Sequence, residues 1–248
     1  MHRIGHFVAI AILSAVAVAT EAGLPPEVAD RLENAVSFDD TEKFKGTYRI
    51  TISSVVQKPN GKSRKDSLIE ADVARLGDGT TRRHLLKYIE NGSDITEEKR
   101  TEFEGEEGGR PNKKSSDDSD EELADPFGST ADHYRFGPPE TRGSTVVMAF
   151  EPAPGHENDE DIGRGSIAWG AGSLAPRWLE VEAVHPPKPL KELRLRMEFD
   201  LVDDDLYMSR LETDGLAKIL LLKREFHVDI SFDDIRPAEQ DGALVQGP

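Results

Sequence analysis

The chain has 248 residues, no cysteine and a formal net charge of −17. A surface this acidic repels phosphate backbones and anionic lipid headgroups, which argues against nucleic-acid binding and against electrostatic docking to a membrane. The absence of cysteine excludes disulfides and the lipidated cysteine of a lipoprotein, and an exported protein without disulfides suits a bacterial envelope.

The first segment predicts a secretory signal peptide at residues 1–19. Arg3 supplies a short positive start, Phe7–Ala19 is an almost unbroken apolar run, and Ala17–Ala19 has the small-residue pattern of a cleavage site. A retained membrane anchor is the alternative, but the run is short for a spanning helix. We therefore expect a soluble protein of residues 20–248, periplasmic or secreted and without a transmembrane anchor, that forms one domain.

Residues 24–38 predict a short amphipathic helix. Apolar residues recur every three or four positions from Leu24, and Pro25 and Pro26 fit a first helical turn. Such a helix could lie on the apolar face of a sheet.

Four strands then predict an up-and-down meander. Residues 48–56 alternate between apolar and polar and lead through Asn60-Gly61 to a return strand at 69–73. A second pair is expected from Thr80–Glu90 and Asp94–Phe103, joined at Asn91-Gly92.

Residues 104–126 predict a disordered acidic insertion, because glycine, serine and acidic residues leave almost nothing to bury. Its acidic run at 117–122 suggests calcium, but the alternating ligand order of a calcium loop is missing, which favours a solvated loop. The stretch His156–Asp161 is interpreted in the same way, as an exposed hairpin connection.

Strand patterning resumes at Thr145–Glu151 and Gly165–Trp169 and persists to the end of the chain. It is clearest in Leu193–Leu201 and Phe226–Phe232, where apolar and charged residues alternate strictly. The tally is about ten strands with one or two short helices. The fold class expected is therefore mainly β: an incomplete antiparallel β-barrel, a curved sheet with its apolar face covered by the helices.

Two patches permit more than one interpretation. The apolar run Leu216–Leu222 is either a strand buried on both sides or at a barrel seam, or an exposed lip that touches a partner or membrane. Trp169 and Trp178 bracket a glycine-rich turn, where packing is a commoner role than stacking on a sugar.

No catalytic motif stands out. The chain lacks a Gly-x-Ser-x-Gly elbow, Ser-x-x-Lys, a phosphate-binding glycine loop and the usual zinc spacings of histidine. His133 and His227 are interpreted as exposed strand histidines, and Glu180 and Glu182 as the solvent side of a strand. We expect no catalytic residue, no metal and no cofactor.

The segment from Gly165 to Pro237 resembles bacterial envelope proteins of the outer-membrane lipoprotein-sorting (LolA/LolB-like) superfamily. The resemblance rests on Gly165-Ser166-Ile167-Ala168-Trp169, on the strands Pro176–Glu182 and Leu193–Leu201, and on the closing Phe226–Ile235. It implies an incomplete barrel with helices over an apolar cavity that holds acyl chains. The acidic insertion departs from the family pattern, and no residue matches its cargo-gating positions.

The leading hypothesis is a non-enzymatic, exported protein that binds a hydrophobic ligand such as a lipid or lipoprotein acyl chain, as a carrier. Its candidate cavity wall is Tyr48, Ile50, Ile52, Met148, Phe150, Leu195, Met197, Phe199, Val228 and Ile230. The alternative is an envelope sensor or protein-interaction module whose apolar face is filled by its own helices. A third hypothesis, a hydrolase assembled from distant residues, needs a converging cleft of histidines and carboxylates.

Overall fold

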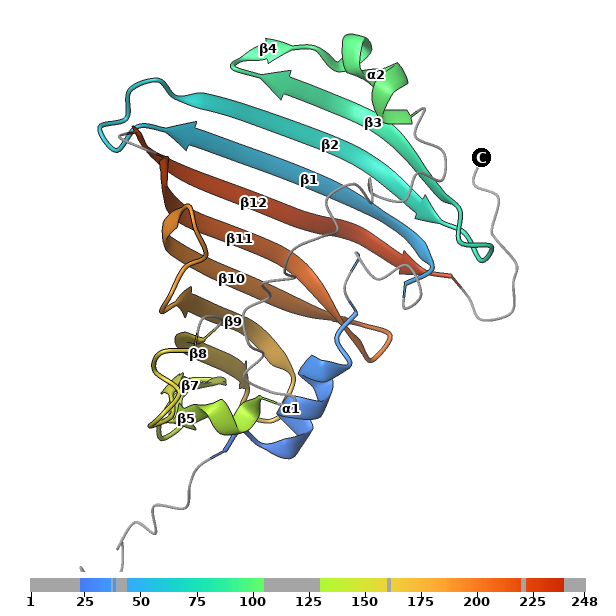
Figure 1. The fold of residues 1–248 in the computed structure, drawn as a ribbon. Helices are drawn as coiled ribbons and strands as arrows, with labels where there is room; N and C mark the ends of the chain where they lie inside the picture. Colours follow the sequence, from blue (N-terminus) through green and yellow to red (C-terminus); the bar gives the residue numbers. More distant parts are fainter. Residues whose placement is uncertain are drawn as a thin grey trace, which may run out of the picture.

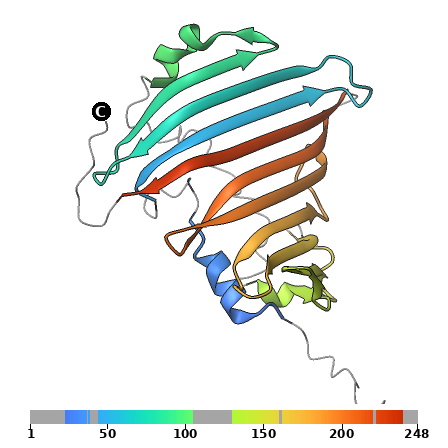
Figure 2. The ribbon, with the colours of Figure 1, turned by 180° about the vertical axis from the view of Figure 1, so that it is seen from behind.

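The computed structural model describes residues 23–36, 38, 44–104, 130–159, 162–219 and 222–238. They form a curved antiparallel sheet that does not close into a barrel, as Figures 1 and 2 show from opposite sides. The expected signal peptide lies outside the described residues, and so does the expected acidic insertion apart from Glu104.

Twelve strands make up the sheet in the described part of the chain. They are β1 (Gly46–Gln57), β2 (Lys65–Arg75), β3 (Thr81–Glu90), β4 (Ser93–Asp94), β5 (Tyr134–Phe136), β6 (Glu140–Arg142), β7 (Thr145–Pro152), β8 (Gly163–Gly170), β9 (Pro176–Ala183), β10 (Leu190–Val202), β11 (Asp205–Ile219) and β12 (Leu222–Pro237). Their order is β4-β3-β2-β1-β12-β11-β10-β9-β8-β7-β5, with β6 paired to β7. The expected incomplete barrel is confirmed; strands as short as β4, β5 and β6 carry no readable periodicity.

Two tight turns explain where the long strands reverse. Asn91 and Gly92 both have positive φ, 50° and 80°, and join β3 to β4; Asp203 and Asp204, with φ of 52° and 70°, join β10 to β11. A two-residue hairpin whose twist matches its strands needs positive φ at both positions, which asparagine, aspartate and glycine tolerate best. The turns expected at Asn91-Gly92 and around Asp203 are thus confirmed.

The strand expected over Asp94–Phe103 is wrong. Only β4 pairs with β3, and the helix α2 (Thr96–Glu104) follows. Its sequence consists mostly of strong helix formers, and Glu97 and Glu98 lie in the first turn, where the helix dipole favours acidic side chains. Asp94 Oδ1 accepts hydrogen bonds from Thr96 N at 3.0 Å and from Thr96 Oγ1 at 2.6 Å, which fixes the turn into the helix.

α2 lies along the outer edge of β3. The hydroxyl of Thr96 accepts a hydrogen bond from Tyr88 N at 2.8 Å, and Glu104 Oε1 accepts one from Leu85 N at 3.1 Å. Ile95 N, just before the helix, donates to Tyr88 O at 2.9 Å. This helix and the residue before it therefore form hydrogen bonds with main-chain groups of β3 that could otherwise pair with a further strand.

The expected amphipathic helix is confirmed as α1 (Pro26–Glu33), with Pro26 at its first position. It lies beside β9, at the end of the sheet that curls most strongly (Figure 1). Val28 is fully buried there, and Leu24 and Leu32 pack against the same core. That core consists of Val28, Tyr134, Met148, Phe150, Ile162, Ile167, Trp169, Leu179 and Val181.

A second core is mainly aromatic. Phe38 is 1% exposed, with its ring centroid 4.4 Å from that of Phe232 and 4.5 Å from that of Tyr48. Phe44, Val73 and Tyr207 complete the cluster. Phe38 and Phe44 precede β1, so the chain before β1 seals part of the sheet formed by β1, β2 and β12.

Within the run Leu216–Leu222, β11 ends at Ile219 and β12 begins at Leu222, which pairs with Ile219. Leu222 is 58% exposed and Leu216 is half-buried, so these two side chains do not fit a strand buried on both sides. A continuous apolar run fits a hairpin as well as a buried strand, so periodicity could not separate them. None of the helices in the described ranges is long and apolar enough to cross a membrane.

Candidate functional site

One face of the sheet carries an unbroken row of apolar side chains, which we call the apolar row. Directly opposed residues of antiparallel strands lie on the same face, so the register shows which side chains align. The row crosses from β3 to β7 through Tyr88, Ile69, Ile52, Ile230, Leu211, Met197, Leu179, Ile167 and Met148. An apolar surface therefore extends perpendicular to the strands across most of the sheet.

The ten residues expected to form a cavity wall lie on this face. Ile52, Met148, Met197 and Ile230 are members of the apolar row itself. A neighbouring row on the same face contains Phe150, Leu195 and Val228. Tyr48, Ile50 and Phe199 also lie on this face, on the other side of the apolar row. The structure thus brings all ten to one face, but separates them into buried and half-buried groups.

The buried group lies where the chain covers its own sheet. Met148 and Phe150, exposed by 2% and 3%, belong to the core beneath α1, and Tyr48, at 6%, belongs to the aromatic core. These three side chains are therefore part of the packing of the fold.

Beside the two cores lies a half-buried group, which we call the central strip; its members Met197 and Ile230 pack against the core beneath α1 and the aromatic core, respectively. It consists of Ile69, Ile52, Val228, Ile230, Leu211, Leu195 and Met197, on the consecutive strands β2, β1, β12, β11 and β10. Among helices in the described residues, α1 lies against β9 and α2 along β3, so neither is placed over these five strands. Ile69 and Leu211 could not be found from the pattern of one strand, because only the cross-strand register aligns them with Ile52 and Met197.

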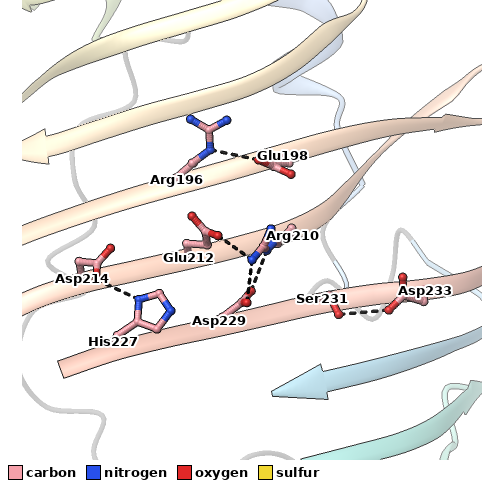
Figure 3. A network of polar contacts seen from close by, with 9 residues as sticks. All are labelled: Arg196, Glu198, Arg210, Glu212, Asp214, His227, Asp229, Ser231 and Asp233. Atoms are coloured by element: carbon pink, nitrogen blue, oxygen red, sulfur yellow. Dashed lines mark hydrogen bonds and ion pairs between the residues drawn. The ribbon is translucent and has the colours of Figure 1, made fainter. Parts of the chain in front are cut away.

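The opposite face is a ladder of ion pairs (Figure 3). Arg210 binds Asp229 through two hydrogen bonds of 2.9 and 2.8 Å and also reaches Glu212 at 2.7 Å. The guanidinium of Arg210 lowers the pKa of Asp229, although partial burial of the carboxylate opposes the shift. The two faces therefore differ sharply in polarity, as strict alternation requires.

The same face holds Glu180, Glu182 and Trp178. Glu182 pairs with Arg164 at 2.7 Å, and Glu180 approaches Arg196 at 3.5 Å. Trp178 lies under Arg196, whose guanidinium carbon is 4.8 Å from the ring centroid, whereas Trp169 is 3% exposed in the core. Packing roles, as expected, account for both tryptophans.

Basic residues gather at the end of the strands formed by the β1–β2 and β11–β12 hairpins, which we call the basic end. Segments 58–66, 188–192 and 218–225 contain nine basic residues and three acidic ones, and β3 and β4 add Glu90 and Asp94 at the same end. The basic ones are Lys58, Lys62, Arg64, Lys65, Lys188, Lys191, Lys218, Lys223 and Arg224. The turn with Asp203–Asp205 lies at the other end, about 50 Å away along strands of this length. Figure 1 shows the hairpins β1–β2 and β11–β12 side by side at the basic end.

One polar cluster went unnoticed in the sequence. His133, His156 and Asp159 bring three ligand-type atoms within 4.8 Å of one another, and all three side chains are half-buried. The sequence predicts an exposed strand histidine at His133 and an exposed connection at residues 156–161. The spacing of His156 and Asp159 was visible, but only the pairing of β5 with β7 brings His133 to them.

A scan against protein-family models finds no match, and no curated protein matches the sequence. Among solved structures, the chain is similar to a putative outer membrane lipoprotein-sorting protein domain from Vibrio parahaemolyticus, at 13% identity and a TM-score of 0.35, over 89% of this chain and 94% of that one. It is also similar to a DUF1329 family protein from Desulfovibrio piger, at 11% identity and a TM-score of 0.35, over 88% and 93%. A third likeness is to the MucA/MucB complex of Pseudomonas aeruginosa, at 10% identity and a TM-score of 0.26, over 84% and 94%.

Proposed function

We propose that the chain is an exported envelope protein that binds a hydrophobic ligand, an acyl chain of a lipid or lipoprotein, on its central strip. The observation that carries this proposal is the continuity of the apolar row over strands whose side chains remain half-buried. A row needed only for packing would be as buried along β10, β11 and β12 as it is at Leu179 and Ile167, which are exposed by 4% and 0%.

The dimensions of the central strip suit a long, flexible ligand. Five neighbouring strands, about 4.8 Å apart, give a strip about 19 Å long, in the range of an extended long-chain acyl group. Burial of each CH₂ contributes about 0.8 kcal/mol, so affinity would accumulate along the chain without any single dominant contact. The ligand would lie across the strands rather than along one of them.

The cellular role follows from the same hypothesis. Export through the signal peptide at residues 1–19 would place residues 20–248 in the periplasm, where a hydrophobic cargo needs a carrier to cross water. A lipid or lipoprotein carrier that exchanges cargo with the outer membrane is the role we favour, with an envelope protein as a further partner.

The rival hypothesis is an envelope sensor or interaction module with a filled apolar face. It requires the central strip to be covered by the protein's own helices. α1 covers the end at β9, and the aromatic core covers the region around Tyr48 and Phe232. Neither reaches Leu195 or Leu211, which belong to neither core.

The test compares apolar leucines on the two faces. Leu195 and Leu211 are half-buried on the central strip, whereas Leu68 is equally half-buried but lies on the polar face, opposite Ser53. Purified protein is titrated with a dansyl-labelled fatty acid, and native mass spectrometry examines it for co-purified acyl species. Replacing Leu195 and Leu211 by glutamine should weaken probe binding about tenfold per site, since each exchange forfeits roughly 1.4 kcal/mol of apolar contact.

The matched control is Leu68→Gln, which should leave probe affinity within twofold of the unaltered protein. If the probe does not bind, raises no thermal stability and no acyl species co-purifies, the carrier hypothesis is wrong. Equal losses in the Leu68 and Leu211 variants would also contradict it, because they would report on the fold rather than on one face.

A further inference from the structure

His133, His156 and Asp159 form a compact group, the His–Asp cluster, at the end of the sheet that holds β5, β7 and β8. His133 is the last residue of the 3₁₀ helix η1 (Ala131–His133), directly before β5. His156 and Asp159 lie in the connection between β7 and β8. The cluster is separate from the central strip, and the proposed function makes no use of it.

The backbone holds the three residues in place. Ala153 N donates to His133 O at 2.7 Å, which extends the pairing of β5 with β7 by one step. His156 N donates to Ala153 O at 3.0 Å, and Asp159 N donates to His156 O at 3.2 Å. Ile162, three residues after Asp159, is fully buried in the core beneath α1. The side chains are thus presented by hydrogen-bonded turns at the border of a packed core.

The side-chain geometry matches the ligand shell of a small divalent ion. Asp159 Oδ2 lies 2.8 Å from His156 Nδ1 and 3.6 Å from His133 Nδ1. Ligands bound at 2.0–2.1 Å are about 2.9 Å apart when they subtend 90° at the ion and about 3.4 Å apart at the tetrahedral angle. Both measured separations lie near these values.

The rings and their surroundings favour the same interpretation. The two imidazoles stack with centroids 4.0 Å apart and an interplanar angle of 17°. The Nδ1 atoms of both rings lie near the same oxygen, Asp159 Oδ2. Asp132 Oδ1 is 3.8 Å from His133 Nε2, the nitrogen that would face away from the ion. At this separation the carboxylate adds negative charge beside the ring but makes no hydrogen bond to it.

We propose that His133, His156 and Asp159 bind a divalent transition-metal ion, with water in the remaining positions. Two imidazoles and one carboxylate suit zinc and its neighbours in the first row better than calcium or magnesium, which prefer oxygen ligands. The side chains of His133, His156 and Asp159 are exposed by 32%, 34% and 36%, which leaves solvent access on one side of the ion. The ion would join η1 and β5 to the β7–β8 connection.

The experiment uses the full-length purified protein, stripped with a chelator and dialysed. Calorimetric titration with ZnCl₂ should show one ion per chain, and Co²⁺ should give the visible absorption of a bound ion with nitrogen ligands. At a free Zn²⁺ concentration of 100 times Kd, Tm should rise by about 5–10 °C.

Three variants decide where the ion binds. His156→Ala and Asp159→Asn should each reduce Zn²⁺ affinity at least tenfold and abolish the cobalt spectrum. His84→Ala removes a histidine that also faces a carboxylate, Glu104, but lies far away on β3, and it should change neither readout. Circular dichroism verifies that each variant is folded.

Two results would overturn the proposal. One is the absence of Zn²⁺ binding at one equivalent, which would leave the cluster as a hydrogen-bonded histidine stack. The other is binding that survives in both His156→Ala and Asp159→Asn, which would place the ion elsewhere, for example on the acidic run at 117–122.

Discussion

Replacing Gly165 by alanine should destabilise the fold, because Gly165 lies where two strands and an aromatic ring are in close contact. Gly165 lies on β8 between Phe150 of β7 and Val181 of β9. An alanine Cβ there would be 2.9 Å from Phe150 Cζ and 2.8 Å from the carbonyl carbon of Glu180, and closer still to that carbonyl's oxygen. Phe150 is 3% exposed, so its ring has little room to retreat, and the Glu180 carbonyl is main chain.

The magnitude follows from these contacts. Extra methylenes in a packed core cost about 1–3 kcal/mol, and a clash with backbone belongs at the upper end of that range. For a chain of this size, each 1 kcal/mol lowers Tm by about 2–4 °C, so a loss of about 3 kcal/mol predicts a fall of about 6–12 °C. Differential scanning calorimetry measures Tm, and urea unfolding gives the change in the free energy of unfolding.

The matched control is Gly172→Ala, because a Cβ at Gly172 would meet nothing within 4 Å. That substitution should change the free energy of unfolding by no more than about 0.5 kcal/mol. A Tm for Gly165→Ala within about 2 °C of the control would refute the close approach of β8, β9 and Phe150, because even the smallest overpacking cost predicts a shift of about that size.

Three further outcomes follow from the geometry. Because Arg210 lowers the pKa of Asp229, the pair stabilises the fold above the ordinary aspartate pKa and this contribution is lost as pH falls through the lower folded-state value. Asp229→Asn should therefore cost about 1 kcal/mol at pH 7 and progressively less below about pH 4, as urea unfolding across pH would show. Ile167→Ala, at a fully buried position, should cost about 2–5 kcal/mol in the same assay. The protein should be retarded on a cation exchanger at pH 7 and low salt despite its negative net charge, and Lys62→Glu with Lys223→Glu should abolish that retention; elution of the unaltered protein in the void would contradict a basic strand end.

The long alternating strands could be predicted because each carries its own evidence. In Leu193–Leu201 and Phe226–Phe232 one face is apolar and the other charged, and only an extended backbone separates them so cleanly. The structure places these segments in β10 and β12.

The failures have a common physical cause. The sequence predicts a strand where α2 lies because Asn91-Gly92 indicates a hairpin, whereas the acidic first turn of α2 and its contacts with β3 favour a helix. The His–Asp cluster could not be predicted because β5 is only three residues long. A strand this short has no recognisable pattern, so its pairing with β7 is visible only in the tertiary structure. Register is likewise a property of strand pairs, which is why the apolar row emerged only from the structure.

The position of α2 has a consequence for how copies of this protein meet one another. An open sheet ends in strands whose main-chain groups can template a strand from another molecule, the route by which β-proteins form fibrils. At β3 those groups are engaged by Thr96 and Glu104, through Tyr88 N and Leu85 N. A helix of nine residues thus occupies the edge of β3 at which a strand of a second copy could otherwise pair.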